Sequence, residues 1–201
     1  MDNNYNNIYK SLITINEMLN DRGYTNQIPS YSKNEIKLLE KNNNLEFIVK
    51  ENDKIIIIKY ILFKLRPTYI KQILDVLIDN YKLNSSNCEI ILLLNENAGT
   101  SVEKIINKYI TNKNLFIQLF LIKKTTINIT KNKYIPQHRI LSTTEVKEIY
   151  KKYNILNKSQ FPIIFNNDPI AKYLAMRIGD ICEIKRYSST SGICYSYRIC
   201  R

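Results

Sequence analysis

The chain has 201 residues, of which 44% are hydrophobic, and its 30 Lys and Arg against 18 Asp and Glu give a formal net charge of +12. This hydrophobic content excludes a disordered chain and allows one large or two small domains. The polar start, Met1 to Asn20, lacks a signal-peptide core, and no apolar run reaches the roughly 18 residues of a membrane span. We therefore expect a soluble, intracellular protein.

The first predicted element is an amphipathic helix that ends near Gly23, a glycine suited to close a helix. Its apolar residues fall at three- and four-residue steps, which places them on one face: Ile8, Leu12, Ile15 and Leu19. Ser32 with Glu35 forms a capping box, which predicts a second, short helix through Lys41.

Strand and helix patterns then alternate along residues 45–130. Apolar runs predict strands at 45–49, 55–62, 89–94, 115–122 and 126–130, with a turn at 51–54 and a loop at 84–87. Helical periodicity predicts a helix from 67 to 81 and another that opens at a capping box of Thr100 with Glu103. This order predicts a sheet covered by helices, and we place the domain boundary after residue 134.

Positive charge is concentrated in the second half of the chain. Residues 1–100 carry 12 basic and 12 acidic side chains, whereas residues 101–134 carry seven lysines against Glu103 alone, and residues 135–201 carry 11 against five. The abrupt excess indicates a polyanion as partner, and a solvated basic face is an equally good interpretation of charge alone.

Residues 135–201 contain local signals for a small α+β domain. A capping box of Ser142 with Glu145 predicts one helix, and Asp168 with Pro169 predicts the start of another, ended by the turn 177–179. Alternating residues predict strands at 180–186 and 193–199, and the turn-rich segment 188–192 between them predicts a hairpin.

The motifs of this region follow a specific order: IPQH at 135–138, the capped helix, FP at 161–162, NDPIAKY at 167–173, an RxG turn at 177–179 and RYSSTSGxxxSYRIC at 186–200. This order resembles the fifth-subunit family shared by the eukaryotic nuclear RNA polymerases, whose C-terminal domain corresponds to a small, separate component of archaeal RNA polymerase. The run IYKSLITINEMLNDRGY at 8–24 also resembles the opening helix of the eukaryotic members, which the archaeal counterpart lacks.

The resemblance implies a non-catalytic subunit of a multisubunit DNA-directed RNA polymerase. Residues 1–134 would form a jaw domain near downstream duplex DNA, and residues 135–201 an assembly domain against the largest subunit. The phosphodiester chemistry and its magnesium would belong to the two large subunits, so the chain itself would need no cofactor. The location would be the nucleus, or the cytoplasm or virion if a large DNA virus encodes the chain.

The resemblance also implies DNA contact at residues 97–101, where eukaryotic relatives hold a Thr-Pro-Ser-Ala motif. This chain keeps the hydroxyls of Thr100 and Ser101 without the proline, and Lys104 and Lys108 follow on one helix face. Helix N-terminal amides, hydroxyls and lysines can all hold phosphate. The alternative is that Thr100 acts only as a helix cap.

A subunit interface is implied around the hairpin and the motifs that lead to it. Tyr and Arg suit such a role because they bury a large area while keeping a polar tip. Ser189 and Ile193 depart from the charged residues usual in the family, so the detailed contacts differ. The implied interface residues are His138, Asp168, Pro169, Arg177, Arg186, Ser188, Thr190, Gly192, Tyr197 and Arg198.

Catalysis and metal binding are not predicted. A nuclease needs an acid-x-Lys pattern on a strand, but Asp53 lies in a turn and Glu89 is followed by two isoleucines. The cysteines lack CxxC spacing and only His138 could assist them, so we expect buried free thiols and a structural histidine. The thiols are Cys88, Cys182, Cys194 and Cys200.

A second class of function stays open on the sequence, namely a free-standing nucleic-acid-binding factor built on the same fold. The two classes differ in one observable property. A subunit is present at one copy per polymerase, whereas a free factor does not co-purify with the polymerase.

Overall fold

A computed structural model describes residues 4–42, 45–51, 54–81, 88–188, 190 and 192–201. The predicted loop 84–87, part of the predicted turn 51–54 and Ser189 lie outside the described residues. The chain divides into two compact units, Met1–Ile127 and Asn128–Arg201. Within the described residues, no helix combines the length and the apolar character needed to cross a membrane.

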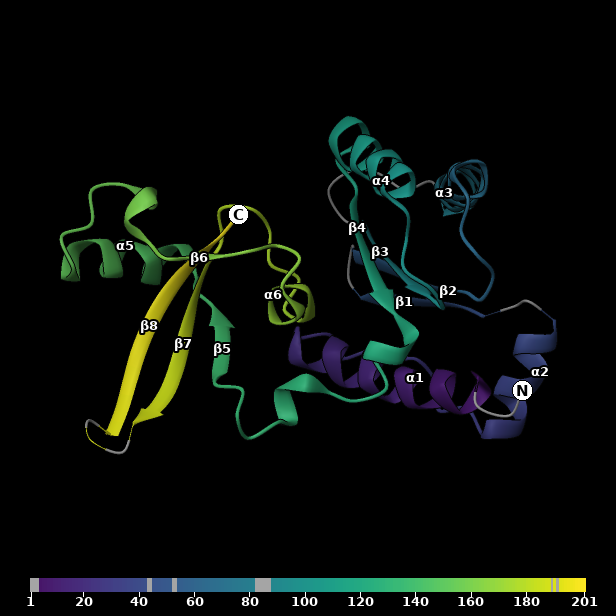
Figure 1. The fold of residues 1–201 in the computed structure, drawn as a ribbon, viewed down its shortest axis with the longest axis horizontal. Helices are drawn as coiled ribbons and strands as arrows, with labels where there is room; N and C mark the ends of the chain where they lie inside the picture. Colours follow the sequence, from purple (N-terminus) through teal and green to yellow (C-terminus); the bar gives the residue numbers. More distant parts are fainter. Residues whose placement is uncertain (1–3, 43–44, 52–53, 82–87, 189, 191) are drawn as a thin grey trace. The chain divides into compact units, whose positions relative to one another are not determined.

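The N-terminal unit is built on a four-stranded sheet with the order β1-β2-β3-β4 (Figure 1). Strands β2, β3 and β4 are mutually parallel, and β1 is antiparallel to β2. All seven residues of β3 are buried, as expected of a central strand covered on both faces. The strands are β1 (Glu46–Glu51), β2 (Lys54–Ile61), β3 (Cys88–Leu94) and β4 (Phe116–Leu121).

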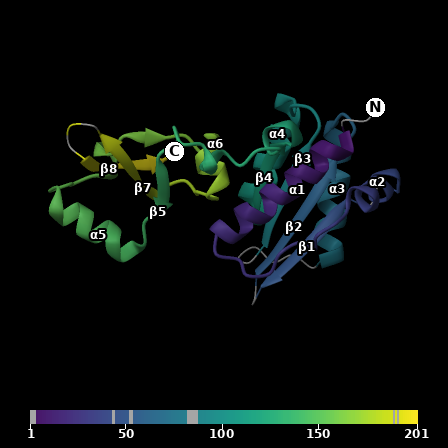
Figure 2. The same cartoon turned by 90° about the horizontal axis from the view of Figure 1, so that it is seen from below.

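Helices cover both faces of this sheet, with α3 and α4 on one face and α1 on the other (Figures 1 and 2). Against α3 and α4, the strands present a buried cluster that includes Ile57, Ile90 and Ile117. On the other face, the hydroxyls of Ser11 and Tyr60 join α1 to β2 at 2.7 Å. The helices are α1 (Asn4–Asp21), α2 (Lys33–Lys41), α3 (Pro67–Tyr81) and α4 (Thr100–Lys113).

The C-terminal unit has its own four-stranded sheet, with the order β5-β7-β8-β6. Its helices pack on opposite faces, because Ile181 joins the cluster of α5 whereas the next residue, Cys182, joins the cluster of α6. The elements are β5 (Gln137–Ile140), α5 (Thr143–Lys152), β6 (Ile163–Ile164), α6 (Pro169–Tyr173), β7 (Ile181–Ser188) and β8 (Gly192–Cys200).

The predicted α+β and α/β class is confirmed, and three local predictions are wrong. Residues 126–130 form no strand; a short 3-10 helix, η2 (Ile129–Lys131), occupies part of them, because Asn128 accepts from the Thr130 amide at 2.9 Å and caps the turn. Helix α6 ends at Tyr173 and not at the turn 177–179, since Ala175 already adopts a left-handed φ of 56°. The N-cap of α4 is Gly99 and not Thr100, with no side-chain cap bond.

The structural division after Ile127 lies earlier than the boundary expected after residue 134, which stays a prediction. Asn128 is buried, and its side-chain amide donates to the Tyr173 hydroxyl of α6 at 3.0 Å. Residues 128–134 therefore contribute contacts to the C-terminal unit.

We predict that fragment 128–201 folds alone and unfolds at higher urea concentration than fragment 135–201. Loss of a buried hydrogen bond costs about 1–3 kcal/mol when one partner stays unsatisfied, which here is the Tyr173 hydroxyl. Asn128→Ala in the longer fragment should move its midpoint toward that of the shorter one. Equal urea midpoints for fragment 128–201, for its Asn128→Ala variant and for fragment 135–201 would place the boundary after residue 134.

Candidate functional site

The first candidate surface lies on the first half of α4 and holds the four residues implied to contact DNA. Thr100, Ser101, Lys104 and Lys108 are all exposed. Their spacing of three and four residues places them along one side of the helix. Neither lysine has an ion-pair or hydrogen-bond partner within the part of the chain that the structure describes. We call these four residues the α4 basic face.

The start of α4 leaves the two hydroxyls available. The Gly99 carbonyl accepts from the amides of Val102 and Glu103 at 2.9 and 3.1 Å, so Gly99 opens the helix. The hydroxyls of Thr100 and Ser101 have no partner among the described residues. The prediction that Thr100 is occupied as a cap is therefore wrong, and both hydroxyls can donate to a ligand beside the first-turn amides.

The second candidate surface is one face of the β5-β7-β8 sheet. Directly paired residues share a face, and Arg186 pairs with Cys194 while Arg198 pairs with Cys182. His138 pairs with Ile184, so it lies on this face too. Within the described residues, neither guanidinium has an ion-pair or hydrogen-bond partner. We call His138, Arg186 and Arg198 the arginine face.

His138 is held as a neutral ring. Its Nδ1–H donates to the Pro136 carbonyl at 2.7 Å. Burial lowers the pKa of His138 below its ordinary value, and Arg186 and Arg198 lower it further, whereas the Pro136 bond and Asp168 act in the opposite sense. The positive charge of this face therefore comes from the two arginines, and the histidine fixes the local backbone.

The remaining implied interface residues shape the chain around these strands. Asp168 caps α6 by accepting from the Ile170 amide at 2.9 Å, and Pro169 is the first helical residue, as predicted. At the hairpin tip, the hydroxyls of Ser188 and Thr190 lie 3.1 Å apart, and Gly192 has a φ of 71° that favours glycine. The Arg177 amide donates to Asp180 at 2.7 Å.

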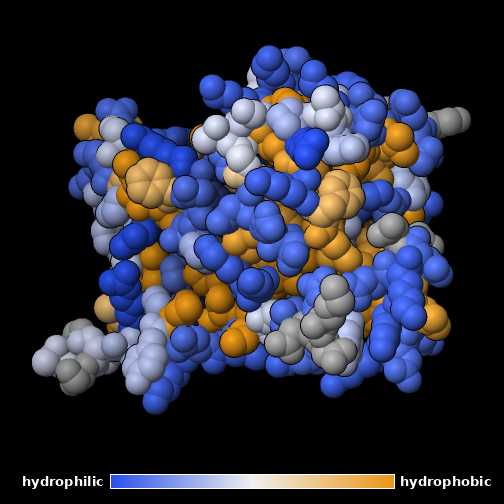
Figure 3. All heavy atoms as spheres, turned by 45° about the vertical axis from the view of Figure 1, so that its right-hand side comes forward, coloured by the Kyte–Doolittle hydropathy of each residue, from blue (hydrophilic) through white to orange (hydrophobic). Residues whose placement is uncertain are grey.

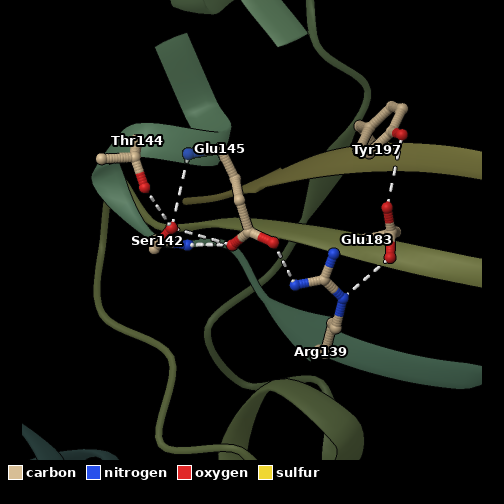
Figure 4. A network of polar contacts seen from close by, with 6 residues as sticks. All are labelled: Arg139, Ser142, Thr144, Glu145, Glu183 and Tyr197. Atoms are coloured by element: carbon tan, nitrogen blue, oxygen red, sulfur yellow. Dashed lines mark hydrogen bonds and ion pairs between the residues drawn. The ribbon is translucent and has the colours of Figure 1, made fainter. Parts of the chain in front are cut away.

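Tyr197 lies on the opposite face from the arginines, because it pairs with Glu183. Its hydroxyl donates to Glu183 at 3.3 Å, within a polar network that Figure 4 shows. Burial and the Glu183 carboxylate raise the pKa of Tyr197 to about 12. Tyr197 therefore serves internal packing, and the structure does not bring it together with Arg186 and Arg198.

Arg139 is the centre of this network (Figure 4). Its guanidinium donates to Glu183 at 2.8 Å and to Glu145 at 2.6 Å, which ties α5 to the sheet. Glu145 also accepts from the Ser142 amide at 2.8 Å and so completes the predicted capping box. The Ser142 amide and Arg139 lower the pKa of Glu145 to about 2.

Three exposed residues near the hairpin tip were missed by sequence reasoning: Tyr187, Ile193 and Tyr195. Tyr187 is 79% exposed and pairs with Ile193, and Tyr195 is 50% exposed. They share the face of Tyr197, beyond the part that α5 covers. Strict alternation in the two strands was the signal that could have found them. Figure 3, which does not label these three residues, shows hydrophobic residues exposed within a mostly hydrophilic surface on the side that it draws.

The groups considered for catalysis have structural partners. Arg22 pairs with Glu89 and donates to Gln118 at 2.8 Å, so Glu89 serves a buried ion pair. Burial raises the pKa of Cys182 to about 11, which favours the unreactive thiol, whereas Cys194 is exposed and not buried as expected. Among the described residues, no cluster of His, Cys, Asp or Glu is able to hold a metal ion.

Comparison with known proteins follows the same division of the chain. A family model of the RNA polymerase Rpb5 C-terminal domain matches residues 127–200. The subunit rpabc1 of RNA polymerases I, II and III from Dictyostelium discoideum is 27% identical over 193 residues, which is 93% of each chain. The subunit Rpo5 from Pyrococcus abyssi is 46% identical over 76 residues, which is 38% of this chain and 92% of that relative.

Rpo5 from Nitrosopumilus maritimus is 41% identical over 76 residues, 38% of this chain and 90% of the relative. These matches define the class as subunits of DNA-directed RNA polymerases. Within that class, the chain belongs to the Rpb5/Rpo5 family. The expectation of a non-catalytic polymerase subunit is thereby confirmed, and the match to the Dictyostelium protein extends over both units.

Proposed function

We propose that this chain joins its C-terminal unit to the largest subunit of a DNA-directed RNA polymerase and supports downstream duplex DNA with its N-terminal unit. The observation that carries the proposal is that a chain with a family-matched C-terminal unit has two separate basic surfaces whose cations lack ion-pair partners among the described residues. Each surface lies on a regular element, so the backbone positions from which its side chains extend are fixed relative to one another.

The arginine face supports the assembly role. Arg186 and Arg198 lie on neighbouring strands and have no ion-pair partner in the described part of the chain, and a guanidinium fork binds carboxylates in a bidentate manner. A partner that supplies acidic side chains would cover them at a modest cost in desolvation, because Arg186 is exposed and Arg198 partly buried. The neutral ring of His138 adds no charge that the partner would have to neutralise.

The α4 basic face supports the DNA role. Lys104 and Lys108 lie one turn apart and the hydroxyls of Thr100 and Ser101 precede them, which offers a phosphate backbone both charge and hydrogen-bond donors. Glu103 in the first turn reduces the net charge of this face. Such a surface holds duplex electrostatically and without sequence preference.

We predict that Lys104→Gln with Lys108→Gln lowers the log–log salt slope of DNA retention by assembled polymerase by up to about two, roughly one for each lost phosphate contact. Changing both lysines to Glu should weaken DNA retention by the polymerase further at low salt. Stability should change by less than about 0.5 kcal/mol, since both positions are exposed.

Lys37→Gln with Lys41→Gln is the matched control, because it removes the same charge from two exposed positions one turn apart on α2. Retention is measured on immobilised polymerase across a salt series. Superimposable slopes for wild type and the Lys104/Lys108 pair would show a solvated face and contradict the DNA role.

The location follows from the proposed role: the protein acts where its polymerase transcribes, in the nucleus or the cytoplasm, with the virion included if a virus encodes it. A free-standing nucleic-acid-binding factor gains no specific support, because the C-terminal unit matches a polymerase subunit along almost its whole length.

A further inference from the structure

Two exposed aromatic side chains lie in the N-terminal unit, between the end of β2 and the start of α3. Phe63 is 54% exposed and Tyr69 is 47% exposed. Their rings meet edge to face with centroids 5.8 Å apart. Neither ring belongs to the cluster that α3 and α4 form with the sheet among the described residues, so the pair presents large aromatic area to solvent.

The charged side chains nearest to this pair along the chain are positive. Lys64, Arg66 and Lys71 are exposed, and residues 61–74 include no acidic side chain. None of the three cations has an ion-pair or hydrogen-bond partner within the described ranges. The next acid, Asp75, already accepts from the Tyr109 hydroxyl at 2.8 Å. The chain next to the two rings thus supplies three cations without an ion-pair partner among the described residues, and Glu96 follows β3 at the same end of the sheet.

The sheet places this surface at the same edge as the start of α4. Ile61 pairs with Leu94 in parallel register, and the Asn95 amide donates to the Ile61 carbonyl at 3.2 Å. Leu65 and Ala98, from the two following loops, pack against the same core cluster.

Aromatic rings among unpaired cations are the chemistry that binds single-stranded nucleic acid. Bases stack on the rings and phosphates meet the cations, whereas in a duplex the bases are already stacked and paired. We propose that Phe63 and Tyr69, with Lys64 and Arg66, form a stacking site for unpaired bases. Lys71, two positions after Tyr69 on α3, faces another side of the helix. The site goes beyond the proposed duplex contact and uses none of the residues of the α4 basic face.

The test is fluorescence anisotropy of the full chain with three strands of about ten nucleotides, a length within the range of such sites: oligothymidylate, oligouridylate and an abasic strand with the same phosphates. Wild type should bind both base-bearing strands more tightly than the abasic strand. Phe63→Ala should weaken oligothymidylate binding by about fivefold or more and leave abasic binding nearly unchanged, as expected for a lost stacking contact.

Tyr69→Ala should act in the same direction, and Val76→Ala, an exposed apolar residue of α3, is the matched control with no expected effect. A preference between oligothymidylate and oligouridylate would identify DNA or RNA as the ligand. Equal binding of abasic and base-bearing strands by wild type, or no effect of Phe63→Ala, would overturn the inference. The Lys104→Gln with Lys108→Gln variant, assayed on duplex DNA, tests the proposed duplex contact separately. The stacking site and the duplex contact can therefore each be disproved without the other.

Discussion

Replacing Arg22 with methionine is expected to lower the free energy of unfolding by about 3–5 kcal/mol, because it leaves Glu89 as a buried charge without its partner. The two side chains are 4% and 10% exposed, and the pair joins the C-terminal end of α1 to the start of β3. Arg22 also donates to Gln118 on β4 at 2.8 Å. Loss of the Arg22 guanidinium therefore removes a polar link from the end of α1 to β3 and β4.

Urea unfolding followed by circular dichroism measures this change. The double variant Arg22→Met with Glu89→Leu removes both charges and should recover much of the loss, because replacing a whole buried pair by apolar groups is often nearly neutral. If the single variant Arg22→Met and the double variant unfold at the same urea concentration, the buried charge of Glu89 does not determine the loss of stability.

Reversing both charges of the arginine face is expected to reduce incorporation into polymerase by at least about tenfold. Arg186→Glu with Arg198→Glu places like charges against an acidic partner surface, which costs several kcal/mol at an interface. The fold should survive, because Arg186 is exposed and Arg198 partly buried and neither makes an ion pair within the described chain. The measurement is competition between tagged wild type and variant for one polymerase pool.

Lys147→Glu with Lys151→Glu makes the same change in charge on exposed positions of α5 and serves as the control. That control should incorporate like wild type. If the arginine and lysine pairs behave alike, general charge and not a specific interface governs assembly, and the proposed role of the arginine face is wrong.

Elements with a local signal were predictable from sequence. The capping boxes at Ser32 and Ser142 mark the starts of α2 and α5, and Asp168 with Pro169 marks the start of α6. The hairpin of β7 and β8 follows from alternation around a turn-rich segment. In each case the residues that decide the structure are neighbours in the chain.

Elements defined by distant partners were not predictable in this way. Strand β5 has only four residues and exists because it pairs with β7, more than forty residues later. The segment 126–130 has a strand-like composition, yet the capping side chain of Asn128 and its bond to Tyr173 select a short helix. At α4, Thr100 and Glu103 match a capping box, but Gly99 takes the cap position.

The α4 basic face was predictable in its arrangement, whereas the arginine face was predictable only in its composition. Lys104 and Lys108 share a face because a helix fixes their spacing, so this prediction needed no tertiary information. Arg186, Tyr197 and Arg198 were grouped from sequence, although Tyr197 and Arg198 are consecutive strand residues and alternation alone puts them on opposite faces. The strand register then places Arg186 on the face of Arg198. Register across strands depends on the whole sheet, which single-sequence patterns do not encode.

The membership of this protein in a polymerase is tested most directly by affinity purification of the tagged chain from its own source, followed by quantification of every co-purifying protein. We expect the two large catalytic subunits of a DNA-directed RNA polymerase at one copy each per tagged chain, retained at salt concentrations that remove nucleic acid. Recovery of the chain without those subunits, or its release together with the DNA, would contradict the account and favour a free-standing nucleic-acid-binding factor.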